Sequence, residues 1–489
     1  MSGPVKLLRR LADVNPVTLK EIRQLVRTRF ILWAMLLYPL VLLLVSGCVL
    51  SSATALASRL SDPAARAFAL LTVTAGPGLL GGALVPLGVL TSLAIPLMTG
   101  IRLTRETARA RMDLQFTTAL TAQDIVSGKI MGAFLLTLTF AALSLPFLTL
   151  AYLMRGIDLA DIAWATLATV AMSLVSTTVA VTIGSLRLPV GLRVTLLAIG
   201  YVIGGFYVLI GAVVTVVDTH LFFVSRASLE PWAVAGLSAL AVVALVAFGR
   251  AWAAANLMPD HTDGKRGLRH LELVLVAVTW AVALTGTALT GDDEWAIGTA
   301  WAFIALIGVA CFALFQPTGV SRAVAAHAPR SLPGRIFSFP FATTMASGAL
   351  FAGLLTAVSE GVLVGCFALS GDNVGRAFSI TLSTFGEILL VATLVAMVFR
   401  ACKVRRGLYA VGPVIVFAVF GVLQLSGMLE AMDVVPDAEV LFGNFSGITS
   451  RPMDHAAYGF AGLCVFVPYV AVAVRRAFRL YRRPEAAAE

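Results

Sequence analysis

Charged residues are scarce in this sequence of 489 residues. They make up 13% of the chain, whereas hydrophobic residues make up 59%. A soluble globular chain typically carries about 25% charged residues. The mean hydropathy of +0.93 points the same way. The composition therefore excludes an ordinary soluble domain and favours a chain that is surrounded mainly by lipid.

Short alternating apolar segments, which would indicate a transmembrane barrel, are also missing. Continuous apolar runs recur instead, each about 20 residues long, which is the length that a helix needs to cross a bilayer. We therefore predict an all-α polytopic membrane protein with about twelve transmembrane helices and both termini in the cytoplasm. The predicted spans are 30–50, 78–101, 130–153, 162–184, 194–217, 231–254, 271–290, 295–316, 342–369, 377–399, 408–429 and 456–474. The stretch 67–101 is too long for one simple crossing, so we expect its glycine-rich start to be broken or re-entrant.

Basic residues are unevenly distributed between the predicted loops. With the N-terminus inside, 30 of the 36 Lys and Arg residues fall on the cytoplasmic side, and the remaining six are Arg59, Arg66, Arg155, Arg226, Arg376 and Arg451. This bias follows the positive-inside rule and supports the span count. Topology and anionic membrane lipids therefore explain the net charge of +10, which does not indicate nucleic-acid binding.

Cysteine pairs are absent. The five cysteines are scattered and no CxxC occurs, so the sequence indicates neither a zinc site nor a disulfide framework. Asp260, His261, Asp263 and His270 match no compact metal site, and we interpret 256–270 as a cytoplasmic linker and expect no bound metal. The basic, amphipathic start of the chain predicts no cleavable signal peptide.

The segment "NPVTLKEIRQLVRTRF", residues 15–30, predicts an amphipathic helix at the cytoplasmic surface. Asn15 suits an N-cap and Pro16 suits the first helical turn. Leu19, Ile22, Val26 and Phe30 share one face, while the charged Lys20, Glu21, Arg23, Arg27 and Arg29 lie largely elsewhere. A generic basic membrane anchor is the alternative interpretation.

The loop "RLTRETARARMDLQFTTALTAQDIVSGK", residues 102–129, is polar and helix-prone. Thr121 and Asp124 resemble a capping box that begins a new helix, which then continues through Gly128 and Lys129 into the third span. We expect Lys129 near the headgroup layer. The alternative is that this is the polar helix of an ordinary cytoplasmic loop.

Two carboxylates fall inside predicted spans of the second half, Glu360 in "TAVSEGVLVG" and Glu387 in "STFGEILLV". A carboxylate at that depth is costly and is a candidate for function, here a proton or cation site. The alternative is a polar packing contact beside Gly361, Gly365 and Gly386.

Both the loop and the N-terminal helix resemble type-2 ABC (ATP-binding cassette) exporter permeases. In that family the loop reads approximately E-R-E-x-G-T-L-E-x-L-L-x-T-P-L-S-x-x-E-I-V-x-G-K, and the corresponding residues here are Glu106, Asp113, Thr118, Leu120, Thr121, Asp124, Ile125, Val126, Gly128 and Lys129. Ala108, Ala110 and Ala119 depart from the pattern. Residues 15–30 are similar to the family's elbow helix, and "LPFLTLAYLMRGI", residues 145–157, resembles the end of its third span.

The resemblance implies that the loop is a coupling helix that docks on a separate ATPase. The residues that match the loop pattern, from Glu106 to Lys129, would form the contact. The elbow would include Asn15, Pro16, Lys20, Glu21 and Arg23. This chain lacks the GxxxxGK[ST] phosphate loop, because "SGKI" has neither the upstream Gly nor a following Ser or Thr. We therefore expect no enzyme activity and no cofactor here, with ATP and Mg²⁺ on two partner ATPase subunits.

The resemblance also implies a domain plan: an elbow helix at 1–29, a six-span permease unit at 30–255, the linker at 256–270, a second six-span bundle at 271–474 and a basic tail at 475–489. Since only the first half carries a docking helix, we expect a homodimer, although one chain forming the whole membrane part is the alternative. We expect a prokaryotic inner-membrane exporter for a substrate of amphiphilic character. A proton- or ion-coupled secondary transporter using Glu360 and Glu387 is the competing class, and a non-transporting scaffold is a third.

Overall fold

The protein is described here by a computed structural model. The described residues are 16–26, 28–57, 75–108, 121–154, 157–186, 188–198, 201, 230–258, 264–290, 329, 331–342, 344–370, 374–402, 415–416 and 452–482. Across these ranges the regular structure is helical, without any strand. Six helices in them are long and apolar enough to cross a bilayer. The prediction of a helical, multi-pass membrane protein is confirmed.

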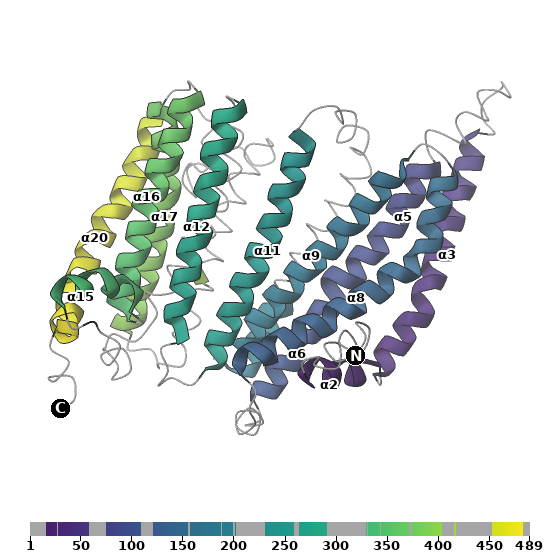
Figure 1. The fold of residues 1–489 in the computed structure, drawn as a ribbon, viewed down its shortest axis with the longest axis horizontal. Coiled ribbons are helices and arrows are strands. Elements are labelled where there is room, and N and C mark those ends of the chain that lie inside the picture. Colours follow the sequence, from purple (N-terminus) through teal and green to yellow (C-terminus); the bar gives the residue numbers. More distant parts are fainter. Residues whose placement is uncertain are drawn as a thin grey trace, which may run out of the picture. The chain divides into compact units, whose positions relative to one another are not determined.

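The chain divides into two compact units, Met1–Leu257 and Met258–Glu489. In unit 1 a short helix, α2, lies across the end of the bundle at which α3 begins (Figure 1). The longer helices pack beside one another, and α8 and α9 each contact most of the other helices of the unit. The helices of unit 1 are α2 (Pro16–Val26), α3 (Arg29–Ala57), α5 (Ala75–Val89), η2 (Leu90–Ala94), α6 (Ile95–Ala108), α8 (Ala122–Leu153), α9 (Leu159–Ser185) and α11 (Glu230–Leu257).

The second span is one continuous rod made of α5, the π-helical turn η2 and α6. Its glycines do not break the described helix but allow close packing on α3. A Cβ added at Gly78 would lie 2.9 Å from Val49, and one added at Gly82 would lie 2.8 Å from Val45. The predicted break at the start of 67–101 falls mainly on residues outside the described ranges.

The core of unit 1 is mainly apolar, and a polar contact joins α3 to α8 within it. Tyr38 on α3 meets Phe140 on α8 edge to face, with ring centroids 5.4 Å apart. Its hydroxyl lies 2.5 Å from the hydroxyl of Ser144, one turn further along α8. Because the phenol hydroxyl has a hydrogen-bond partner, Tyr38 can be buried among leucines without leaving an unpaired polar group.

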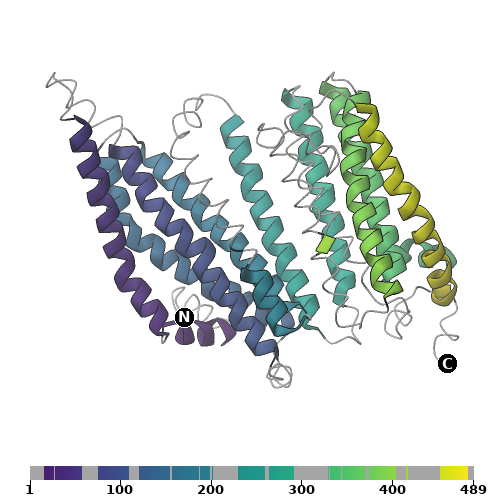
Figure 2. The ribbon, with the colours of Figure 1, turned by 180° about the vertical axis from the view of Figure 1, so that it is seen from behind.

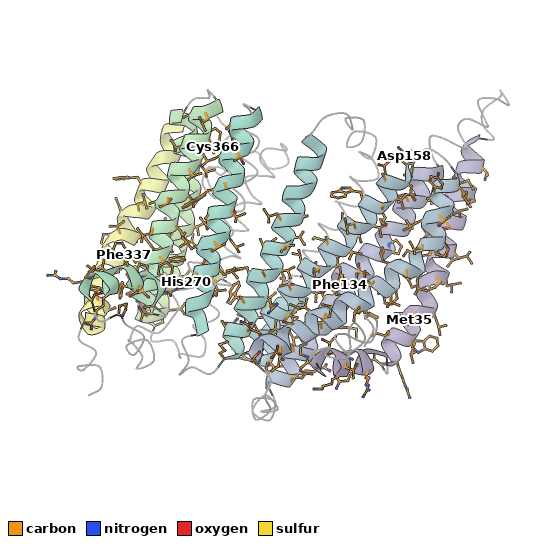
Figure 3. All side chains as sticks on the ribbon, viewed as in Figure 1. Met35, Phe134, Asp158, His270, Phe337 and Cys366 are labelled. Atoms are coloured by element: carbon orange, nitrogen blue, oxygen red, sulfur yellow. The ribbon has the colours of Figure 1, made fainter. Side chains whose placement is uncertain are left out.

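Unit 2 is built around α16, α17 and α20, which lie side by side (Figure 2). Its core joins Phe351 on α16, Leu389 on α17 and Phe466 on α20. The short helix α15 carries Phe337, labelled in Figure 3, which is 78% exposed. The helices of unit 2 are α12 (Gly264–Thr290), α15 (Leu332–Ser338), η4 (Phe339–Phe341), α16 (Met345–Ser370), α17 (Val374–Ala401) and α20 (Pro452–Arg482).

A buried arginine fixes the chain ahead of α16. Arg269, on the first turns of α12, is 4% exposed. Its guanidinium donates to the carbonyls of Pro340, Ala342 and Thr344 and to the hydroxyl of Ser347. This contact explains one difference from the expected linker, because residues 264–270 already belong to α12 and are packed against the bundle.

Two other helices also extend further than the sequence predicted. The helix α11 continues to Leu257, and α20 continues to Arg482 through the start of the predicted basic tail. Of the twelve predicted spans, those at 194–217, 295–316 and 408–429 lie mostly outside the described residues, so the total number stays a prediction.

Candidate functional site

The site begins with α2, which has two different faces. Val17, Thr18 and Glu21 are buried against unit 1, whereas Leu19 is 46% exposed. Leu19 therefore does not pack on the bundle, while the side chains of Ile22, Val26 and Phe30, which complete the expected apolar face, lie outside the described residues. Leu19 remains available to the surroundings of the protein, as an interfacial helix requires.

The start of α8 is fixed by the predicted capping box, which is confirmed. The Thr121 hydroxyl accepts from the Asp124 backbone N–H at 3.2 Å. In return, Asp124 Oδ2 accepts from the Thr121 N–H at 3.0 Å and from its hydroxyl at 2.6 Å. The Asp124 carboxylate thus holds the helix terminus, and its nearest partners lie within its own turn.

A charged cluster joins α2, α6 and α8 two turns after this cap. Lys129 Nζ lies 2.6 Å from Glu21 Oε1 on α2 and 2.8 Å from Glu106 Oε2 on α6. The exposed fractions of the three side chains are 2% for Lys129, 6% for Glu21 and 21% for Glu106. One ammonium is therefore shared between two carboxylates in a place that water scarcely reaches.

The charge balance of this cluster determines what the removal of each side chain would cost. With one positive and two negative charges, its formal net charge is −1. Removing the lysine would leave two carboxylates facing each other without a cation, while removing one glutamate would leave a balanced pair. The contact between the three helices thus depends most strongly on Lys129.

A glycine next to the lysine brings α2 very close to α8. A Cβ added at Gly128 would lie 2.7 Å from Cβ of Val17 and 3.1 Å from the Thr18 backbone nitrogen. Real Cβ atoms do not approach one another so closely, so only glycine fits without displacing α2. Gly128 and Lys129 therefore dock the same helix by shape and by charge.

The last turn of α6 is held by a second buried cation, Arg193. Its guanidinium donates to the Thr107 hydroxyl at 2.5 Å and to the Gly184 carbonyl, at the end of α9, at 3.0 Å. Arg193 is 6% exposed, and burial lowers the pKa of its guanidinium. Sequence reasoning assigned Arg193 only to a basic cytoplasmic loop. The signal that could have identified it was an arginine placed directly before an apolar run.

Deeper in unit 1, polar side chains connect the π-helical turn η2 to α8 and α9. The Ser173 hydroxyl on α9 donates to the Thr91 carbonyl in η2 at 2.8 Å and lies 2.8 Å from the Thr137 hydroxyl on α8. Single π turns inside α-helices are frequent at functional sites. No motif in the sequence predicted this cluster, because serine and threonine are ordinary residues in membrane helices.

The structure thus brings together Glu21, Glu106, Gly128 and Lys129, which the sequence had assigned to two separate segments. Ile125 is 1% exposed and packs inside unit 1, whereas Thr121, Lys20 and Arg23 are exposed. Pro16 begins α2 as expected. Asn15, Asp113, Thr118 and Leu120 lie outside the described residues, so their predicted contacts stay predictions.

In unit 2, Glu360 on α16 is 8% exposed. Glu387 lies within α17, but its side chain is outside the described residues. Within the described ranges, no three His, Cys, Asp or Glu side chains are grouped closely enough to hold a metal ion. His270 instead stacks on Phe341, with ring centroids 4.4 Å apart.

Comparison of the whole chain with protein-family models, with curated proteins and with solved structures finds no match.

Proposed function

We propose that this chain is the transmembrane permease subunit of an ATP-driven ABC transporter, acting as an exporter. The observation that carries the proposal is the cluster of Glu21, Lys129 and Glu106. It links the elbow-like helix, the segment before the loop 109–120 and the segment after it. The family resemblance rests on these segments and on residues 145–157.

The cluster suits mechanical coupling because it ties surface segments to long membrane helices. The helix α8 begins at the polar cap of Thr121 and continues without interruption to Leu153. A partner that pushes on the loop 109–120 or on the first turn of α8 would move this rod as one body, since an α-helix is stiff along its axis. The salt bridges would carry the same displacement into α2 and α6.

The proposed contacts with the partner divide into two kinds. Thr121, Gln123, Lys20 and Arg23 are exposed and are free to face a docked subunit. Lys129 and Gly128 are buried, so their role is to position α2 and α8 rather than to touch the ATPase. In this proposal two ATPase subunits bind ATP and Mg²⁺, the chain forms a homodimer in a prokaryotic inner membrane, and the cargo is amphiphilic.

The direct test is co-purification of the full chain with the ATPase encoded beside its gene, followed by measurement of ATP turnover. We expect a stable complex whose ATPase rate changes when the permease is present. Glu21→Gln should preserve assembly but lower the permease-dependent rate several-fold, because α2 is no longer held by a salt bridge. Gln24→Ala, at an exposed position of the same helix that is assigned to no contact, is the matched control and should leave the rate unchanged.

Unchanged turnover and assembly after replacement of Asp124 and Lys129 would contradict the coupling role. Uphill flux by the purified chain alone in liposomes, driven only by an ion gradient, would contradict the whole proposal. That second result would support the secondary transporter instead, for which the buried Glu360 is the favouring observation.

A further inference from the structure

Unit 2 contains a cavity between α16, α17 and α20. Its volume is about 540 Å³, which lies within the usual range for small-molecule pockets, about 300–1,000 Å³. One water molecule occupies about 30 Å³ of liquid, so the space greatly exceeds a hydration site. Residues from all three helices line it, among them Ala349, Thr356 and Glu360 on α16, Leu389 on α17, and Phe466 and Val470 on α20.

The cavity exists because small residues face one another where the helices meet. Ala349, Gly353 and Ala357 come from α16, and Gly386 comes from α17. At Gly353 an added Cβ would lie 3.0 Å from Cε1 of Phe466. The Phe466 ring therefore rests against the α16 backbone and forms an aromatic wall of the cavity.

The polar groups of the lining are few and chemically distinct. Among the lining residues whose side chains the structure describes, only Thr356 and Glu360 carry a side-chain oxygen. The Thr356 hydroxyl donates to the Ala352 carbonyl at 2.9 Å, so it presents lone pairs to the cavity rather than a proton. A bare inorganic cation needs about six oxygen ligands, which this lining does not provide. The walls suit an apolar body, and the carboxylate of Glu360 suits a positive charge.

The rim of the cavity indicates the direction of entry. Leu354 on α16 is 49% exposed and Val467 on α20 is 56% exposed, and both line the cavity. Both also belong to apolar stretches, Met345–Leu369 of α16 and Leu463–Arg475 of α20. An exposed apolar rim at this depth faces acyl chains, so a ligand would enter after partitioning into the bilayer.

We propose that this cavity binds a hydrophobic organic cation, with the charged group against Glu360 and the apolar body against the Phe466 ring and the aliphatic walls. The aromatic face adds an attraction for a cation. An anion would meet the Glu360 carboxylate and a threonine lone pair, which repel it. This inference rests on unit 2 alone and is independent of the proposed coupling to an ATPase.

The test uses the full chain in lipid nanodiscs, without nucleotide or any partner, and measures saturation binding of radiolabelled tetraphenylphosphonium with empty nanodiscs subtracted. We expect a single saturable site. Glu360→Gln should weaken binding at least tenfold, and Ala357→Trp should abolish it by filling the cavity from the exposed face of α16. Unlabelled tetraphenylphosphonium should displace the label, whereas tetraphenylmethane, which has the same shape and no charge and is supplied in the nanodisc lipid, should not.

Gly361→Trp is the matched control, because this residue lies on the same helix outside the lining and an added Cβ there meets no atom within 4 Å. It should bind like the unaltered chain. Size-exclusion profiles and thermal unfolding of each variant show whether the fold is intact. Equal affinity in Glu360→Gln or Ala357→Trp, equally effective displacement by tetraphenylmethane, or no saturable binding because lipid occupies the cavity would each overturn the proposal.

Discussion

In each unit a basic side chain is buried where a short helix meets a long one, Lys129 in unit 1 and Arg269 in unit 2, but the two basic groups have different partners. In unit 1, Lys129 binds the carboxylates of Glu21 and Glu106, which come from two other helices. In unit 2, Arg269 binds mainly backbone carbonyls ahead of α16. The first contact is an ion cluster, and the second consists mainly of charge-assisted hydrogen bonds, with the buried carboxylate of Glu272 on the same helix nearby.

The two contacts differ in how rigidly they hold the helices that they join. A backbone carbonyl is fixed in its loop, so the planar guanidinium of Arg269 holds one geometry by several hydrogen bonds at once. Carboxylates at the ends of flexible side chains can follow an ammonium that moves. We therefore expect the Lys129 cluster to stay intact through small side-chain adjustments while α2, α6 and α8 move together, and the Arg269 contact to hold α12 and the start of α16 in one fixed geometry.

The largest expected effect comes from Lys129→Met. It leaves two buried carboxylates without their cation, which should lower the free energy of unfolding by about 3–5 kcal/mol. Thermal unfolding of the purified chain in detergent measures the loss. Lys20→Met on the exposed side of α2 is the control and should change stability by less than about 0.5 kcal/mol.

Adding Glu21→Gln and Glu106→Gln to Lys129→Met sharpens this prediction, since the triple variant buries no uncompensated charge. It should recover most of the lost stability. A triple variant as unstable as the single one would show that Lys129 acts through packing of its aliphatic stem and not through its charge.

A smaller effect is expected from Arg269→Met in unit 2. The variant leaves buried carbonyls without a donor, at a cost of about 1–3 kcal/mol. Arg269→Lys keeps the charge but loses the planar fork, and it should recover only part of the stability. Full recovery with lysine would remove the distinction between the two units, because charge alone would then be sufficient at both places.

The close approach of α2 and α8 gives a prediction of similar size. Gly128→Ala places a Cβ against Val17 and should destabilise the chain by about 1–3 kcal/mol through overpacking. Gly47→Ala is the matched control, because an added Cβ on this helical glycine of α3 meets no atom within 4 Å. The control should be neutral or stabilising by up to about 1 kcal/mol. Equal effects at both sites would mean that α2 does not rest on Gly128.

The smallest expected effect belongs to the cap of α8. Thr121→Ala removes the hydroxyl that accepts from Asp124 and should destabilise by about 1 kcal/mol. Gln123→Ala, on the exposed side of the same turn, should have almost no effect. Thermal unfolding of both variants checks this, and a larger loss at Gln123 would contradict the assignment of Thr121 as the cap.

Local chemistry made part of the fold predictable. The start of α2 at Pro16 and of α8 after Thr121 follow from residues within one turn of the boundary, and continuous apolar runs indicated the membrane helices. The length of the 256–270 linker was overestimated for a physical reason. Its basic residues suggested solvent, but Arg269 is buried by contacts with residues more than 70 positions away, which no local pattern contains.

The sequence predicted individual residues of the candidate site but not the contacts between them. Glu21 and Lys129 were each noticed, yet they are 108 positions apart in sequence and only packing brings them together. The burial of Lys129 was not expected either, because lysine near the end of an apolar run usually reaches the headgroups. Arg193 and the polar cluster around Ser173 had no motif at all.

The π-helical turn Leu90–Ala94 has a consequence for sequence length. Such a turn contains one residue more than an α-helical turn, while the helical segments on either side keep their rotation about the common axis. Deleting a single residue there should therefore shorten the chain without rotating Glu106 away from Lys129. A one-residue deletion in α6 itself would turn that glutamate by about 100° around the axis. Variation in length along this span is thus tolerable at one turn and disruptive elsewhere.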